Sequence, residues 1–451
     1  MIGASLSRWT MAYFASALFF LVAAECMMAG GYGFPHAAVG APATLILVHV
    51  VAIGWLSVLM LGALFQFVPV LVAHPLHNDW LPLPTLLALL SGLAALILGF
   101  LQLASQVDPE LPFFALASVL LGLGFAFALW NLGRTLWSAQ SRPLPARFVM
   151  VGLTSVVATA GFGIVFALVL ARTTTYGPFV ALAGSALVIH VIAGLGGWLT
   201  VTAVGVSYRL FAMFMLAPEL ERSSTKAALY LGVAALAVAI GGGTWAILHG
   251  ANFTLMLSGS AMVGLLAVAL YAGDVVYLYK ARKRRTIELN SRMAALALAS
   301  LAASAVLIVV LLVLGQLKEY AAAVVFLAAF GWLSGLGLAQ LYKIVAFLTW
   351  LECYGPVLGK TQTPRVQDLV IERRATKWFL LYFLAVWAGT IALVIGYSPA
   401  FQGAAAAMLI ATGGIVAQFA RTRRLADVTA DARLPVGVRK PRLLFAPSHQ
   451  N

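Results

Sequence analysis

The chain has 451 residues, of which 63% are hydrophobic and only 9% are charged, and its mean hydropathy is +0.99. A soluble domain carries roughly 25% charged residues, so this composition excludes a soluble globular protein and indicates a polytopic membrane protein. The net charge of +14 does not indicate nucleic-acid binding, because the basic residues lie between apolar runs of bilayer length. Two cysteines, Cys26 and Cys353, lie far apart and predict no disulfide framework.

Twelve apolar runs of membrane-spanning length follow one another along the chain. They predict an all-α fold of twelve transmembrane helices, in which the first run is a retained helix rather than a cleaved signal. The runs cover approximately residues 10–30, 43–72, 83–104, 112–136, 148–171, 180–216, 227–249, 252–279, 293–316, 320–353, 379–398 and 402–420. Residues 1–424 are therefore expected to form a single transmembrane domain, followed by a disordered tail over 425–451.

Basic residues gather in alternate loops, which fixes the expected orientation. They follow the fourth, eighth, tenth and twelfth runs, as in Lys280–Arg285 and Arg421–Arg424, whereas the outer loops contain only Arg172 and Lys318. By the positive-inside rule, both termini are expected to be cytoplasmic in a multi-pass protein of a bacterial-type inner membrane.

One short phrase occurs three times, about 140 residues apart, and indicates an internal repeat. Its copies begin at Gly54, Gly197 and Gly331, each followed by Trp, Leu and Ser or Thr. A polar residue follows each copy at the same spacing, and two of these, Arg209 and Lys343, are basic. The phrase predicts three four-helix repeats over about residues 1–147, 148–292 and 293–424 in pseudo-threefold arrangement. The two basic residues are expected to reach the cytoplasmic surface or to pair with an acidic residue such as Glu219.

Four of the seven histidines are expected at the outer end of the bundle. His49 and His190 lie inside apolar helices at similar depth, His249 ends the seventh helix, and His36 lies in the first outer loop. An imidazole in the membrane is costly unless it has a partner, and neutral imidazole is a common ligand of iron and copper. The pair His49 and His190 therefore predicts a cofactor site, and the alternative is that each ring bonds a backbone carbonyl.

The first helix ends with Glu25, Cys26, Met27 and Met28, again near the outer end. Together with His36, a carboxylate and soft sulfur atoms are suited to copper, so Glu25, Met28, His36 and His249 are candidate metal ligands. The alternative is that the methionines only fill a helix interface.

The helix count, the threefold repeat and the histidine positions resemble the catalytic subunit of the haem-copper oxidase and nitric oxide reductase superfamily. The runs from His49 to Trp55 and from Phe65 to Pro69 are similar to the second helix of such proteins. The resemblance implies that His49 binds haem, with haem b as the expected cofactor, and that His190 and His249 are candidates for a copper site. A sharper version has His49 and His190 as the two axial ligands of one haem.

The chain also departs from this family. The tenth run, 320–353, has no histidine, and His249 is followed by Gly250 instead of a second histidine. A complete binuclear oxygen-reducing centre is therefore excluded, and it stays open whether the chain is an oxidoreductase.

The sequence leaves three functions open. The first is a haem- or copper-binding protein in redox chemistry, nitric-oxide response or cofactor handling. The second is a membrane transporter without a redox cofactor. The third is an accessory or assembly subunit that contacts respiratory subunits or partners in haem or copper delivery. In each case the bilayer surrounds the chain.

Overall fold

A computed structural model describes residues 9–108, 110–435, 438 and 440–444. Within these residues the chain is helical and contains no strand. Twelve helices in the described part are long and apolar enough to cross a membrane, beginning with Thr10–Ala29 and ending with Ser398–Arg423. Helices suit apolar runs of this length because they satisfy every backbone polar group internally where no water is available. The predicted all-α, twelve-helix membrane fold is confirmed.

The described chain divides into two compact units. Unit 1 comprises Met1–Leu47 and Ile287–Asn451, and unit 2 comprises Val48–Thr286. The boundary falls inside the second spanning helix, Pro42–Leu71. Unit 1 therefore brings together helices from both ends of the sequence.

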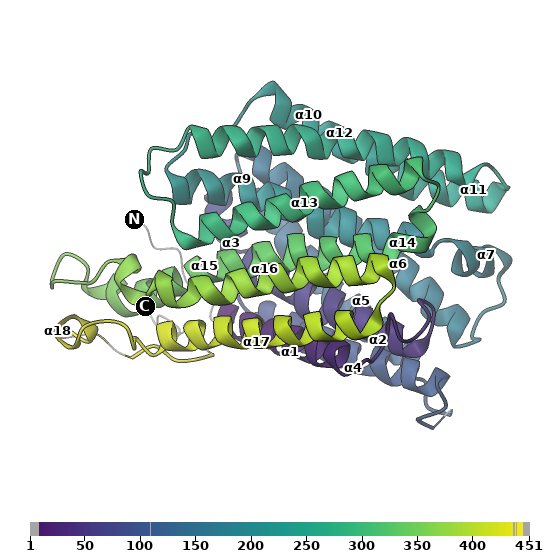
Figure 1. The fold of residues 1–451 in the computed structure, drawn as a ribbon, viewed down its shortest axis with the longest axis horizontal. Helices are drawn as coiled ribbons and strands as arrows, with labels where there is room; N and C mark the ends of the chain where they lie inside the picture. The colour runs from purple at the N-terminus through teal and green to yellow at the C-terminus, as the bar shows by residue number, and fades with distance from the viewer. Residues whose placement is uncertain (1–8, 109, 436–437, 439, 445–451) are drawn as a thin grey trace. The chain divides into compact units, whose positions relative to one another are not determined.

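In unit 1, α17 packs against both α16 and α1, so the last spanning helix lies beside the first (Figure 1). The helical segments of this unit are α1 (Thr10–Ala29), the start of α2 (Pro42–His49), α13 (Leu289–Val313), α14 (Leu317–Phe326), η4 (Leu327–Ser334), α15 (Gly335–Tyr354), η5 (Gly355–Val357), η6 (Val366–Leu369), α16 (Glu372–Ile395), α17 (Ser398–Arg423) and α18 (Ala430–Arg433).

In unit 2, successive spanning helices pack as antiparallel pairs, most extensively α4 with α5 and α10 with α12. Its helical segments are η1 (Val50–Ser57), α3 (Val58–Leu71), α4 (Pro82–Leu103), α5 (Phe113–Ser138), α6 (Leu144–Leu170), α7 (Gly177–Ser185), α8 (Leu187–Val191), η2 (Ile192–Val201), α9 (Thr202–Met215), α10 (Ser223–Ala237), η3 (Val238–Gly242), α11 (Gly243–His249) and α12 (Phe253–Lys280).

Each copy of the repeated phrase lies in a π-helical segment. The segments are η1, η2 and η4, and they interrupt three long helices at corresponding places. Ser57 and Ser334 donate their hydroxyl groups to the carbonyls of Ala52 and Ala329, five residues earlier, each at 2.7 Å. π-Helical turns are rare and occur frequently at functional sites, so the phrase marks the places where the helix geometry changes.

Small residues in this phrase also allow close helix packing. A side-chain carbon at Gly197 would lie 2.4 Å from Ser155 Oγ of α6, and one at Gly331 would lie 2.8 Å from Ser300 Cβ of α13. Trp198 of the second copy donates its indole N–H to Ser57 Oγ of the first copy, at 2.9 Å, in a buried contact. The repeated residues thus position helices as well as shaping them.

The chain after residue 424 was expected to be disordered, but its described part packs against unit 1. Leu425 and Val428 are buried with Cys353, Tyr354 and Leu369, and the Tyr354 hydroxyl donates to the carbonyl of Arg433 at 2.8 Å. Residues 445–451 lie outside the described part. Because apolar side chains of the tail meet a matching apolar surface, the segment is held in place.

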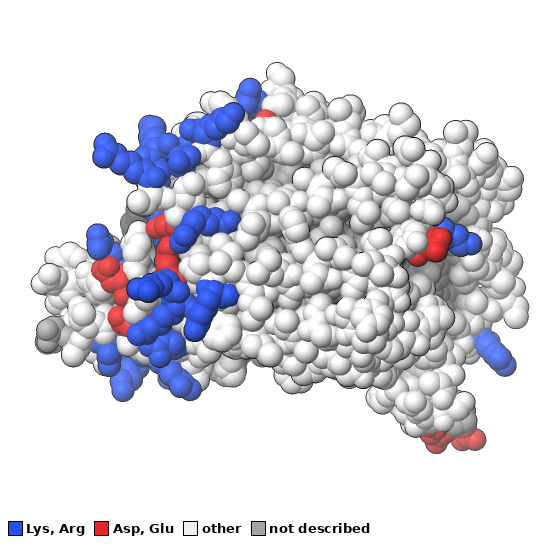
Figure 2. Space-filling model, in the orientation of Figure 1, with Lys and Arg blue, Asp and Glu red and all other residues white. Residues whose placement is uncertain are grey.

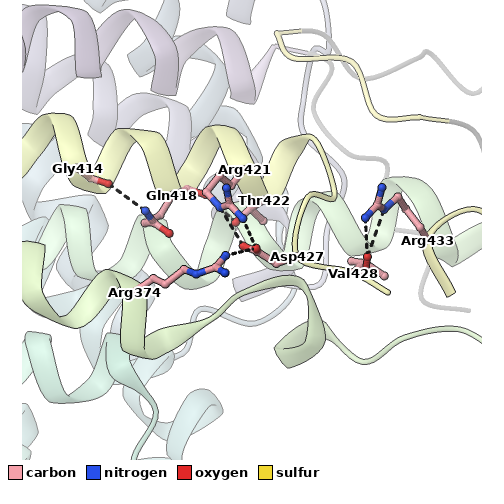
Figure 3. Close-up of polar contacts among 8 residues, drawn as sticks. All are labelled: Arg374, Gly414, Gln418, Arg421, Thr422, Asp427, Val428 and Arg433. Atoms are coloured by element: carbon pink, nitrogen blue, oxygen red, sulfur yellow. Dashed lines mark hydrogen bonds and ion pairs between the residues drawn. The ribbon is translucent and has the colours of Figure 1, made fainter. Parts of the chain in front are cut away.

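Charged contacts fix the same segment. Asp427, whose side chain is 5% exposed, accepts from Arg374 at 2.7 Å and also from Arg421, and Figure 3 shows it between the two guanidinium groups. In Figure 2 the Lys and Arg side chains at this end of unit 1 gather over the ends of α15, α16 and α17, with acidic side chains among them. This end of the unit is therefore the basic one.

Candidate functional site

The structure brings His49 and His190 together in unit 2. His49 ends α2, immediately before η1, and His190 lies in α8, two residues before η2. The centres of the two imidazole rings are 6.5 Å apart, with an angle of 35° between the ring planes. The two histidines stand at different distances from their tryptophans, and regular α-helices would turn them to different faces. The wider turns of η1 and η2 change that angle, and the rings lie near each other.

Aromatic side chains flank the histidine pair. Phe100 lies 5.3 Å from the His49 ring and Phe166 lies 5.4 Å from the His190 ring, between centroids. His190 Nδ1 is buried and has no hydrogen-bond partner, while the backbone carbonyl of Thr159 interacts with the same ring. A buried polar atom without a partner calls for an explanation, such as a bound group.

The spacing of the two rings suits coordination of one ion. Metal–imidazole bonds are about 2.0 Å long, so two imidazoles on opposite sides of one ion have ring centres about 6 Å apart. The observed 6.5 Å agrees with this separation. Gly163 of α6 faces the His190 ring, and a side-chain carbon there would lie 3.6 Å from Cε1. A small residue at this position keeps space beside the ring.

His249 lies elsewhere in unit 2. It ends α11, is exposed, stacks on Trp245 with ring centroids 5.1 Å apart, and its Nδ1 lies 3.0 Å from the Trp245 carbonyl. This is the carbonyl-bonded arrangement that the sequence left open for each histidine. Across the described residues, no group of three or more His, Cys, Asp or Glu side chains is close enough to hold a metal ion.

The remaining predicted ligands lie in unit 1. Glu25 and Met28 lie on a buried face of α1, with 0% and 3% of their surfaces exposed, whereas Cys26 is exposed. His36 is also exposed, and its ring lies beside Gly31, just beyond the end of α1. Of the four residues from Glu25 to Met28, the structure thus buries Glu25 and Met28, leaves Met27 half-buried and exposes Cys26.

The two repeat-related basic residues form ion pairs. Arg209 contacts Glu219 within unit 2, which is one of the partners that the sequence suggested. Lys343 instead contacts Glu288 at 2.8 Å within unit 1, and both side chains are mostly buried. Of the two expected alternatives, both basic side chains thus adopt the pairing with an acidic residue.

A buried polar cluster in unit 2 was not predicted. Asp274 of α12 is 1% exposed and accepts hydrogen bonds from Tyr208, Ser224 and Thr225 at 3.0, 2.6 and 2.7 Å. The only signal in the sequence was an aspartate inside an apolar run. Its three donors come from α9 and α10, and nothing in the sequence indicates that these helices surround it.

Comparison with known proteins supports the fold and no more. No protein-family model matches the chain, and none of the curated proteins does so either. A solved structure described as a heme-copper terminal oxidase dimer is similar to this chain, with a TM-score of 0.62 and 14% sequence identity. The match covers 98% of this chain and 86% of that one. The resemblance drawn from the sequence is therefore confirmed for the fold, which is that of a heme-copper oxidase subunit.

Proposed function

We propose that this chain is a haem-binding redox protein of the membrane, in which His49 and His190 provide the two axial ligands of one haem. The observation that carries the proposal is the 6.5 Å separation of the two rings in a fold like that of heme-copper oxidases. The buried His190 Nδ1 without a partner supports it, because such an atom is costly unless something binds it.

The surroundings of the pair fit a haem better than a hydrated ion. Phe100 and Phe166 present apolar rings, and Gly163 keeps the side of His190 free of a side chain. A haem held by two imidazoles supplies one-electron transfer. The chain's own residues would bind the iron, orient the imidazoles through the helices that carry η1 and η2, and exclude water with the aromatic rings.

A second metal beside the haem finds little support. The Nδ1 of His249 lies within hydrogen-bonding distance of a carbonyl of its own helix, so His49 and His190 are the two histidines used here. The function proposed is accordingly electron transfer or haem handling at a bacterial-type inner membrane, with both termini cytoplasmic. Respiratory subunits or haem-delivery proteins would be its partners.

An optical spectrum tests the proposal. The full-length protein, purified from haem-replete cells, is expected to show a Soret band and a b-type pyridine haemochrome. His49→Ala and His190→Ala should each remove most of that band, because each variant loses one of two axial ligands. His249→Ala is the matched control and should keep it, since this ring lies against its own helix. A colourless wild-type protein, or a band that survives both substitutions, contradicts the proposal.

A further inference from the structure

Glu25 has the least compensated carboxyl group in unit 1. It is fully buried in α1, and its Oε1 accepts one hydrogen bond from Thr412 of α17 at 2.9 Å. Its Oε2 is buried without any hydrogen-bond partner, and no ion pair involves Glu25 among the described residues. Burying an ionised carboxylate without a partner costs on the order of several kcal/mol. A proton on the carboxyl group, or a bound cation beside it, removes this cost. The side chain therefore requires one of the two.

A buried methionine lies on the same face of α1 as Glu25, and another lies on the same face of α17 as Thr412. Met28 is one helical turn from Glu25 on α1, and Met408 is one turn from Thr412 on α17, so each methionine shares a face with a member of the Glu25–Thr412 pair. Met28 is 3% exposed and Met408 is 0% exposed. Both methionines are thus directed into the bundle rather than toward lipid.

The register of α1 and α17 brings the two methionines to the same level. The helices pack against each other and run in opposite directions (Figure 1). One fixed point is the Glu25–Thr412 hydrogen bond, and the other is the close approach of Gln402 to Gly31. Met28 lies between these points on one helix, and Met408 lies between them on the other. The register therefore places both methionines in this interface within about one helical turn of the Glu25–Thr412 pair.

We propose that Met28, Met408 and Glu25 form a binding site for copper(I) between α1 and α17. Thioether sulfur is a soft ligand that suits copper(I), whereas hard divalent ions such as magnesium and calcium favour oxygen ligands. One positive charge neutralises one carboxylate, so the loaded site carries no net charge inside the apolar bundle. The Thr412 hydroxyl holds Oε1 and leaves Oε2 for the ion. The exposed ring of His36 stands beside Gly31 and Gln402, at the end of α1 nearest the site.

Binding at this site exchanges one cation for another. Without copper, the Glu25 carboxyl compensates its burial by carrying a proton. When copper(I) binds, the proton leaves Glu25 for the solvent and the metal takes its place, so charge is conserved and no electron is transferred. The site uses residues of unit 1 only and is independent of the haem proposed for unit 2.

Competition with a chromogenic copper(I) chelator tests the site. Full-length protein in detergent, stripped of metal and kept anaerobic, is expected to withdraw one equivalent of copper(I) per chain and to release one proton. Changing a residue that only supports a metal ligand costs about 10–100-fold in affinity, so losing a direct ligand in Met28→Leu or Met408→Leu should raise the Kd at least about tenfold. Glu25→Gln should weaken binding and abolish the proton release.

Matched variants show whether copper(I) binds at these two methionines or elsewhere in the chain. Met11→Leu changes another buried methionine of α1 and should bind copper(I) as the wild type does. Leucine and methionine have similar volumes, so these variants should keep the elution profile of the folded protein. His49→Ala should lose the haem band and keep copper(I) binding, so the two proposals fail separately. Unchanged affinity in a Met28→Leu/Met408→Leu double variant, or a wild type that takes no copper from the chelator, overturns the inference.

Discussion

Two buried carboxylates, Asp274 in unit 2 and Glu25 in unit 1, are compensated in different ways. Asp274 accepts from three hydroxyl groups, and two of them, on Ser224 and Thr225, lie in the first turn of α10. The positive end of a helix dipole favours a negative charge at that position. Glu25 accepts from one hydroxyl and has an oxygen without a partner. Neither carboxylate has an ion-pair contact with Lys or Arg in the described chain.

The difference indicates what each residue can do. Three donors satisfy both oxygens of Asp274 without a cation, so it joins α9, α10 and α12 as a structural link. One donor is too little for an ionised Glu25, which must carry a proton or bind a positive ion. The number of donors, rather than burial itself, distinguishes the structural carboxylate from the one that is available for binding.

Replacing each carboxyl group by an amide should therefore have unequal effects on stability. In Asp274→Asn, a neutral amide replaces a carboxylate that receives three O–H groups, and its NH2 cannot accept them. We expect the free energy of unfolding to fall by roughly 2–4 kcal/mol. Glu25→Gln keeps an acceptor for Thr412 and removes no charge from the metal-free protein, so its cost should stay under about 1 kcal/mol. Thermal unfolding of both variants in detergent, without metal, measures the difference. Equal losses of unfolding free energy would contradict the inferred difference in hydrogen bonding between the two carboxyl groups.

Removing a single donor sharpens the comparison. Ser224→Ala takes one of three hydrogen bonds from a charged acceptor and is expected to cost about 1.5 kcal/mol. Thr412→Val takes the sole donor from Glu25 and should cost about 0.5–1 kcal/mol, since a bond to a neutral acid is weaker. Only Thr412→Val should alter copper(I) affinity. Unfolding scans combined with the chelator assay report both quantities, and an altered copper affinity in Ser224→Ala would contradict the assignment.

An exposed carboxylate, Asp368, should contribute less to stability than a buried one with several donors. Hydrogen bonds from the Arg365 side chain and backbone hold the pKa of Asp368 below its usual range. A lowered pKa contributes stability above the ordinary carboxyl pKa of about 3.9, and this contribution is lost as the pH falls through the lowered value. Solvent screening limits the pair, so Arg365→Ala should cost less than about 1 kcal/mol at pH 7, and this cost should shrink as the pH falls below about 3.9. Unfolding of the two proteins across this pH range measures the contribution, and a difference that grows toward acid pH would reverse the sign.

Some of the candidate site followed from the sequence. The similar depth of His49 and His190 in apolar runs indicated a pair, and the structure places the centres of their rings 6.5 Å apart. The inward faces of Glu25 and Met28 depend on how α1 packs, and their neighbours Thr412 and Met408 lie at the far end of the chain. No local pattern links residues so distant, so this neighbourhood could not be predicted.

Composition and the period of apolar runs determined the number, type and approximate limits of the spanning helices, because the bilayer constrains length and hydrophobicity locally. The repeated phrase also marked three corresponding positions, and each of them lies in a π-helical segment of the structure. Only the tertiary structure decided that three hydroxyl groups surround Asp274 and that the tail packs on unit 1, and it set the distance between the rings of His49 and His190. These meetings depend on the rotation and register of helices that are far apart in the sequence, and packing sets both.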